Sequence, residues 1–146
     1  AEEADYVPYI ETCDKIHAQT NVAYGMFPNF ITPTDTSGYP AILFWPKGLK
    51  ETEFEWTQLA PKWSGDEKPD YWNEQEVSFD SIMDEDFQNL EPMQRSHDSG
   101  VFESMPLNYQ ERRIYYYHQV IDDWIGRDNL PKNIQVPNVL DPFIEA

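Results

Sequence analysis

The segment from Phe79 to Gln94 constrains this chain most, because it places a carboxylate within an apolar helical stripe. A helix turns by about 100° per residue, so a helical reading of the segment gathers its apolar residues on one face. Those residues are Phe79, Ile82, Met83, Leu90 and Met93. Asp86 falls inside the same sector. A carboxylate that faces a core is costly unless a cation or hydrogen-bond donors meet it. The pattern therefore predicts either a partner for Asp86 or a rotated helix in which Phe87 takes the buried position.

Length and charge limit the class of protein. A chain of 146 residues predicts about one domain, and its net charge of −17 opposes binding to nucleic acid or to anionic membranes. No apolar run approaches the ~20 residues that a membrane-spanning helix needs. The single cysteine, Cys13, excludes a disulfide within the chain and a cluster held by several of its own thiolates. These features indicate a reducing, cytoplasmic location.

Strands are predicted before long helices. The pattern indicates a short helix over residues 6–19, strands over 21–32, 39–45 and 51–60, and a helix from about 70 to 95. Pro92 predicts that this helix kinks or ends near Glu91. Segregated strands and helices are typical of an α+β fold in which helices pack on an antiparallel sheet. Because three strands form a thin sheet with exposed edges, we expect the chain to be part of a larger domain.

A second long helix is predicted after Asn108. Asn108 is a suitable N-cap residue, Glu111 completes a capping-box pattern, and Gly126 predicts the end of the helix. Its predicted inner stripe consists of Ile114, Tyr117, His118, Ile121 and Ile125. The tail is predicted to be extended, and either frayed or packed by four apolar residues: Ile134, Val136, Leu140 and Phe143.

Three stretches of the chain carry a family resemblance. Tyr24–Phe30 reads YGMFPNF, Glu85–Ser96 reads EDFQNLEPMQRS, and Glu111–Asp122 reads ERRIYYYHQVID. In order and spacing they resemble the C-terminal part of the catalytic domain in large subunits of the Rieske non-haem iron oxygenases, which hydroxylate aromatic rings. The resemblance runs from about Ala18 to Ile125. It implies a fold of helix-grip type in which the helix that carries Asp86 crosses an antiparallel sheet.

The resemblance assigns Asp86 to the iron site. It matches the carboxylate of a 2-His-1-carboxylate triad, which holds mononuclear Fe(II) and leaves positions open for O₂. The resemblance also places a substrate pocket near Asp86, lined by Phe79, Ile82, Met83 and Leu90. The implied reaction is hydroxylation of an aromatic or related organic substrate by O₂, as in the catabolism of aromatic hydrocarbons.

The chain departs from the family pattern in its other metal donors. Its three histidines, His17, His97 and His118, include no pair at the family's ligand spacing. A Rieske 2Fe–2S cluster needs two Cys and two His, and Cys13 is the only cysteine. We therefore interpret residues 1–146 as the C-terminal portion of a catalytic domain, with the Rieske domain and both histidine ligands elsewhere. This chain alone is expected to be inactive and to contain no catalytic or cofactor-binding residues of its own.

The resemblance also implies partners. These are the remainder of the oxygenase large subunit, further copies in a homo-oligomer, often a trimer, and a reductase or ferredoxin that supplies electrons. Two alternatives remain at this point. One is a non-catalytic helix-grip module that binds an apolar small molecule, and the other is a structural chain that supports assembly only.

Individual residues also have plainer interpretations. Asp86 can pair with an arginine, for which Arg95, Arg112 and Arg113 are available, or it can be solvated on a rotated helix. His118 is expected to be a core histidine bonded to a neighbour such as Asp122. His17 and His97 are expected on the surface or in loops. A nucleophilic pair of Cys13 with His17 is a weaker possibility.

Overall fold

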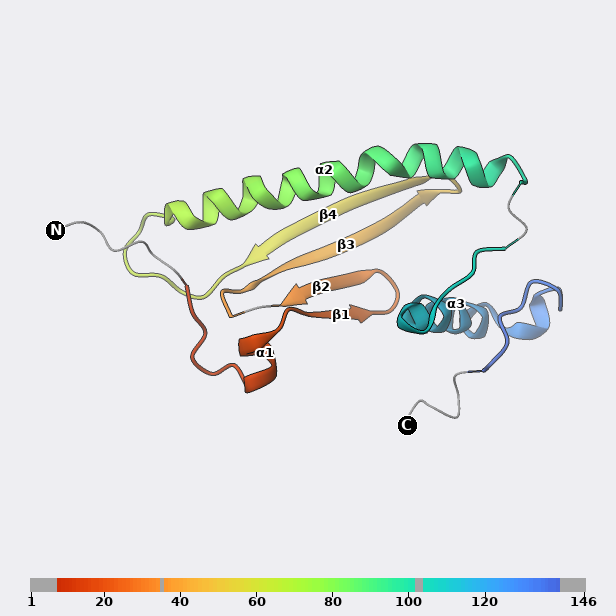
Figure 1. The fold of residues 1–146 in the computed structure, drawn as a ribbon, viewed down its shortest axis with the longest axis horizontal. Helices are drawn as coiled ribbons and strands as arrows, with labels where there is room; N and C mark the ends of the chain where they lie inside the picture. Colours follow the sequence, from red (N-terminus) through yellow and green to blue (C-terminus); the bar gives the residue numbers. More distant parts are fainter. Residues whose placement is uncertain (1–7, 35, 102–103, 140–146) are drawn as a thin grey trace. The chain divides into compact units, whose positions relative to one another are not determined.

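The computed structural model describes residues 8–34, 36–101 and 104–139. The chain divides into two compact units, Ala1–Ser99 and Gly100–Ala146. The first unit contains a four-stranded antiparallel sheet, a short helix and one long helix (Figure 1). Its elements are α1 Lys15–Gln19, β1 Val22–Met26, β2 Phe30–Thr34, β3 Tyr39–Gly48, β4 Glu51–Leu59 and α2 Asp70–Asp98.

The sheet has the strand order β1-β2-β3-β4, and each strand runs antiparallel to its neighbours. Directly paired residues lie on the same face of a sheet. Ile31 pairs with Ile42, and Ile42 pairs with Trp56, so these three share one face, which packs against α2. Tyr24 pairs with Thr32, the residue after Ile31, and both therefore lie on the opposite face. The α+β class is thus confirmed.

The predicted strand over residues 21–32 is two strands. β1 ends at Met26, residues 27–29 form a turn, and β2 begins at Phe30. Apolar residues flank the turn on both sides, so their pattern predicted one strand through the turn residues Pro28 and Asn29. Pro28 lies in the hairpin turn that joins β1 to β2. The sheet consequently has four strands rather than three.

Helix α2 begins at Asp70 as predicted but ends at Asp98, beyond the predicted end. Pro92 lies inside it without ending it. The helix runs along the sheet antiparallel to β4 (Figure 1). Near its start Trp72 is only 1% exposed, and at its end Asp98 pairs with Lys50 of the β3–β4 turn. The helix is therefore attached to the sheet at both ends.

Gly38 provides the close approach that Trp72 needs. Its φ of +142° is a conformation that favours glycine. A Cβ at this position would collide with the carbonyl oxygen of Leu59 and would lie 3.3 Å from the Trp72 ring. The tight turn before β3 thus leaves room for the one large side chain that is fully buried among the described residues.

The second unit contains α3, Arg112–Ile125, between two single 3₁₀ turns, η1 Tyr109–Glu111 and η2 Arg127–Asn129. The predicted capping box is confirmed. The side chain of Asn108 accepts a hydrogen bond from Gln110 N at 2.8 Å, and Glu111 accepts one from Asn108 N at 2.8 Å. Gly126, at φ +86°, ends the helix as predicted.

The predicted inner stripe of α3 is wrong for this unit. Ile121 is half-buried, but Ile114, Tyr117, His118 and Ile125 are exposed. The buried side chains are polar, Gln119 and Asp122. The reason is that this side of the helix holds the tail, as two hydrogen bonds show: Val136 N donates to Asp122 Oδ2 at 2.6 Å, and Tyr115 Oη donates to Pro137 O at 2.7 Å. Leu140 and Phe143 lie outside the described residues.

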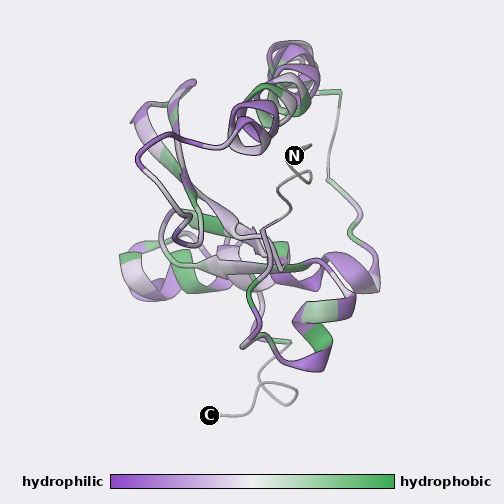
Figure 2. Ribbon diagram, turned by 90° about the vertical axis from the view of Figure 1, so that its left-hand side faces the viewer, coloured by the Kyte–Doolittle hydropathy of each residue, from purple (hydrophilic) through white to green (hydrophobic). Residues whose placement is uncertain are grey.

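Helix α2 is not uniformly apolar. Seen nearly end-on in Figure 2, it carries hydrophilic and hydrophobic residues around its circumference. Among the helices that the structure describes, none has the length and apolar character to cross a bilayer.

Candidate functional site

Aromatic contacts with β4 fix the rotation of α2. The ring of Phe79 lies 4.5 Å from that of Trp56, and the ring of Phe87 lies 4.9 Å from that of Phe54. Trp56 Nε1 also donates a hydrogen bond to Asp80 Oδ1 at 3.1 Å. Phe79 and Phe87, both half-buried, are therefore on the side of the helix that meets the sheet.

Asp86 is exposed, and the half-buried position next to it belongs to Phe87. Of the two arrangements that the apolar pattern allowed, the structure has the rotated helix. The expected alternative of a buried ion pair does not apply, because Asp86 is exposed and no ion pair among the described residues includes it; Arg95 pairs with Glu91. Phe87 follows Asp86 by about 100° around the helix, so Asp86 lies beside the face that packs on the sheet.

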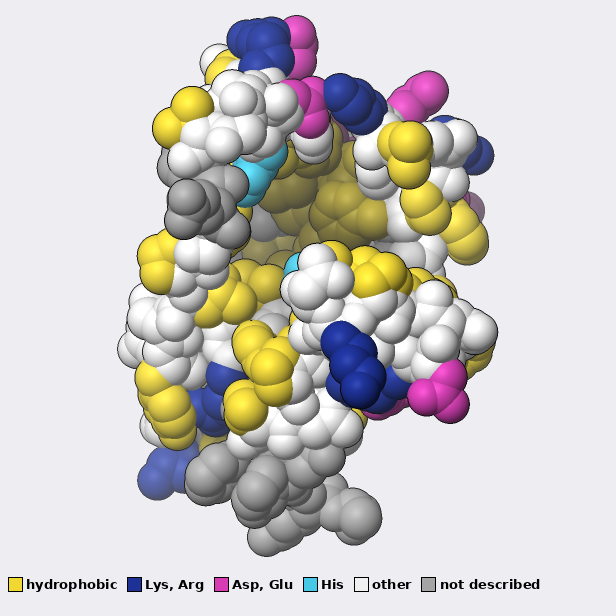
Figure 3. Space-filling view, turned by 90° about the vertical axis from the view of Figure 1, so that its right-hand side faces the viewer, with side chains coloured by type: hydrophobic (Ala, Val, Ile, Leu, Met, Phe, Trp, Pro, Cys, Tyr) yellow, Lys and Arg dark blue, Asp and Glu magenta, His cyan; other side chains and the backbone are white. Residues whose placement is uncertain are grey.

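Apolar side chains surround Asp86 on the surface of α2. Ile82 and Leu90, one turn before and one turn after it, are 52% and 55% exposed, and Met93 is 51% exposed. We call these four residues, Ile82, Asp86, Leu90 and Met93, the Asp86 strip. Figure 3 shows that hydrophobic side chains reach the surface at several places. In the Asp86 strip they adjoin a carboxylate, so this is an apolar surface with one anionic donor.

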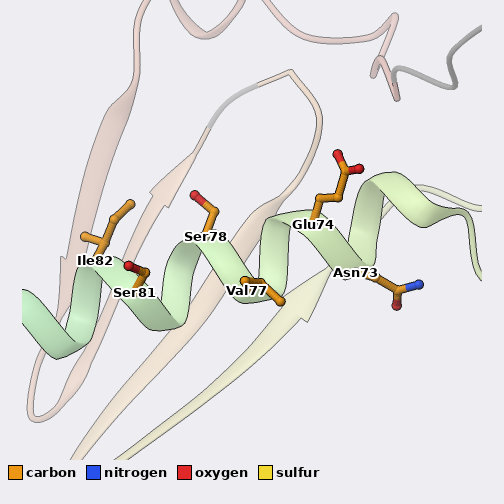
Figure 4. A pocket seen from close by; sticks show the side chains of 6 residues that line it. All are labelled: Asn73, Glu74, Val77, Ser78, Ser81 and Ile82. Carbon is orange, nitrogen blue, oxygen red and sulfur yellow. The ribbon is translucent and has the colours of Figure 1, made fainter.

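The four predicted pocket residues separate into two pairs. Phe79 and Met83 are half-buried on the sheet side of α2, whereas Ile82 and Leu90 are exposed in the Asp86 strip. A shallow depression lies along the N-terminal half of α2 (Figure 4). Its lining residues are Asn73, Glu74, Val77, Ser78, Ser81 and Ile82. It shares only Ile82 with the predicted pocket.

The carboxylates and histidines in the described part of the chain do not form a complete metal site. No group of three His, Cys, Asp or Glu side chains there is arranged to hold a metal ion. Arg95, the nearest expected cation in sequence, is paired elsewhere, and the carboxylate of Asp86 is exposed. An exposed carboxylate of this kind can serve as one ligand of a three-residue iron site. The residues present therefore fit one position of such a site and do not complete it.

His118 is not the core histidine that its position predicted. It is exposed, and its ring makes an edge contact with Tyr117 at 6.1 Å between centroids. Asp122, its expected partner, uses Oδ2 to accept from Val136 N. The apolar stripe gave a wrong prediction for His118 because the polar side of α3 contacts the tail. His97 is exposed near the end of α2, in agreement with the surface position expected for it.

His17 belongs to a hydrogen-bonded chain that sequence reasoning missed. Its Nδ1 lies 2.9 Å from Asp14 Oδ2, and its Nε2 lies 2.6 Å from Tyr24 Oη. Asp14 Oδ1 also caps α1 by accepting from the backbone N–H groups of Ile16 and His17. Both imidazole nitrogens are thus occupied, so the possible Cys13–His17 pair is not formed. An aspartate three residues before a histidine at a helix start is the local signal; the tyrosine depends on the fold.

The pH dependence of stability should reveal the Asp14 contacts. Hydrogen bonds from the backbone N–H of His17, and then from its imidazole, hold the pKa of Asp14 below its ordinary value. A lowered pKa contributes stability that is present above the unfolded-state value of about 3.9 and is lost as the pH falls through the folded-state value. We expect urea midpoints of the wild-type and Asp14→Asn chains to differ at neutral pH and to converge below about pH 4. Asp84→Asn controls for the loss of one charge; parallel curves for wild type and Asp14→Asn would contradict this assignment.

Comparison with known families gives the class of protein. The fold is an α+β domain with a long helix on an antiparallel sheet, and that helix presents the exposed carboxylate of Asp86 between two exposed apolar residues, Ile82 and Leu90. Residues 3–127 match the family model described as ring hydroxylating alpha subunit (catalytic domain). The chain therefore belongs to this family of oxidoreductases, as its three motifs indicated. Members of the family bind non-haem iron. No curated protein and no solved structure matches the chain.

Proposed function

We propose that this chain supplies the carboxylate iron ligand, Asp86, of a Rieske-type oxygenase that hydroxylates an aromatic or related organic substrate with O₂. The observation that carries the proposal is the Asp86 strip: an exposed carboxylate between two exposed apolar residues, Ile82 and Leu90. A ligand must keep its oxygens available, and an apolar substrate needs apolar surface close to the metal. The Asp86 strip offers available carboxylate oxygens and apolar surface on one helix face, within the part of the chain that the family model matches.

Each partner of the site has a defined role in this proposal. Two histidines outside this chain would complete the ligand set, and the Fe(II) held by the three residues would supply the redox chemistry with O₂. The Rieske 2Fe–2S cluster lies on another part of the large subunit and receives electrons from a reductase or ferredoxin. We further propose a cytoplasmic homo-oligomer, a trimer by family resemblance, that acts in the catabolism of aromatic hydrocarbons.

The residues of α2 have separate tasks. Asp86 would provide one carboxylate ligand to the metal, while Ile82 and Leu90 would contact the substrate. Phe79 and Met83 support the helix from the sheet side, since the Phe79 ring contacts Trp56 and Met83 is half-buried. The helix-grip arrangement that we propose for the complete domain would cover the exposed side of the Asp86 strip. Covering this strip would exclude water from the reacting site.

Metal removal tests this function. In the complete oxygenase subunit that carries this chain, an Fe(II) chelator should abolish O₂ consumption with an aromatic substrate. Added Fe(II) should restore it, and added Zn²⁺ should not, because zinc has no redox chemistry. Substrate binding, followed by quenching of tryptophan fluorescence, should survive chelation if the apolar contacts are as proposed. Binding without any iron-dependent O₂ consumption would instead favour the non-catalytic binding module.

A further inference from the structure

A donor and an acceptor can be assigned to each hydrogen bond in the network of Asp14, His17 and Tyr24. Asp14 is held ionised by the contacts that lower its pKa, so its carboxylate accepts and the Nδ1 of His17 must carry the donated hydrogen. In a neutral imidazole the other nitrogen, Nε2, is then an acceptor. The only hydrogen available between Nε2 and Tyr24 Oη, 2.6 Å apart, is the phenolic one. Tyr24 therefore donates to His17.

Tyr24 lies on a different face of the sheet from α2, the helix that carries Asp86. Tyr24 lies on edge strand β1 and pairs with Thr32, on the sheet face opposite the one that α2 covers. Its ring is nearly parallel to the His17 ring, at 17° and 5.9 Å between centroids, and its side chain is partly exposed. Small one-electron oxidants in solution can thus reach the phenol while its proton remains directed at a base.

We propose that Tyr24 is a proton-coupled redox site. When a one-electron oxidant, such as a peroxyl radical formed from O₂, removes an electron from the phenol, the O–H bond of Tyr24 breaks and an N–H bond forms at His17 Nε2. The products are a neutral tyrosyl radical, an imidazolium ion paired with Asp14, and the oxidant reduced by one electron. The proton moves across one existing hydrogen bond, so a high-energy phenol radical cation is avoided.

Each residue of the hydrogen-bond network has a distinct role in this step. Tyr24 gives the electron and the proton, and His17 receives the proton as a positioned base. Asp14 is a positioning residue: it fixes the imidazole tautomer and stabilises the imidazolium that forms, as a carboxylate does for the histidine of a catalytic triad. The inference is independent of the iron-ligand proposal, since none of these residues belongs to α2.

Photochemical oxidation of the intact chain by ruthenium(III) tris-bipyridine tests the proposal. The chain has nine tyrosines, so variants must assign the radical. A fast phase of tyrosyl radical formation should be present in the wild type, absent in Tyr24→Phe and slowed at least about tenfold in His17→Gln. Tyr109→Phe is the matched control, because Tyr109 is 79% exposed and the Arg112 guanidinium lies over its ring. The fast phase should remain in this variant.

Two further readouts separate a redox role from a structural one. The fast phase should show a solvent deuterium isotope effect, because a proton moves with the electron. Asp14→Asn, which retains an N-cap residue for α1, should slow the phase and change the high-field EPR g values of the radical, which report its hydrogen bond. An unchanged fast phase in Tyr24→Phe, or the absence of an isotope effect in the wild type, would overturn the proposal.

Discussion

Replacing Asp86 with alanine in the complete oxygenase subunit is expected to lower substrate hydroxylation by more than about 100-fold, since even outer-shell changes at metal sites cost 10–100-fold. The substitution removes both carboxylate oxygens and leaves a methyl group on an already exposed position. Folding stability should change little, because no described ion pair includes Asp86 and surface substitutions of this kind usually have small effects. Loss of activity with retained stability distinguishes a ligand from a structural residue.

The matched control for this experiment is Asp84→Ala. Asp84 is another exposed carboxylate of α2, two residues earlier and therefore about 200° around the helix from Asp86. It removes the same charge from the same helix but does not belong to the Asp86 strip. We expect near-normal hydroxylation in this variant. Equal losses in both variants would mean that the charge of the helix, and not the position of one carboxylate, is what matters.

Replacing Trp72 with alanine is expected to destabilise the first unit by about 3–5 kcal/mol. Trp72 is 1% exposed, and its ring packs close to Gly38 at the end of the sheet. A cavity of indole size at this contact would detach the start of α2 from the strands. Because typical domains are stable by only about 5–15 kcal/mol, much of the unit should unfold at mild urea concentrations, measured by circular dichroism.

Two companion variants make the Trp72 experiment specific. In Trp72→Phe most of the ring volume remains, and the indole N–H has no hydrogen-bond partner among the described residues that would be lost; we expect a loss below about 1.5 kcal/mol. Leu49→Ala, at a fully exposed position in the β3–β4 turn, should be nearly neutral. A Trp72→Ala chain as stable as Leu49→Ala would show that α2 does not depend on this contact.

Local signals in the sequence predicted local structure well. Asn108 and Glu111 form the predicted capping box, and Gly126 ends α3, because a cap depends on residues within one helical turn. The start of α2 at Asp70 also agrees with the predicted helix start at about residue 70. The hairpin at residues 27–29 was missed because its turn lies inside an apolar stretch.

The rotation of α2 could not be derived from α2 alone. The pairs Ile82–Met83 and Asp86–Phe87 allow two rotations that both bury apolar residues, and they differ by about 100°. Phe54 and Trp56 on β4 select between them by packing on Phe87 and Phe79. The exposure of Asp86 therefore depended on residues distant in the chain.

The same limit applies to α3 and to His17. The apolar stripe of α3 predicted a buried His118, whereas the tail binds the polar side through Asp122. His17 was expected on the surface or in a loop, and its hydrogen bond to Tyr24 of β1 was not predicted. In both cases a contact between distant segments decides the environment of the side chain, and periodicity contains no information on such contacts.

Iron content of the purified oxygenase subunit tests the central claim most directly. Wild type and Asp84→Ala should each retain mononuclear iron, measured by metal analysis after the Rieske iron has been subtracted, and Asp86→Ala should lose nearly all of it. An Asp86→Ala subunit that keeps its full mononuclear iron and its hydroxylation activity would contradict the account.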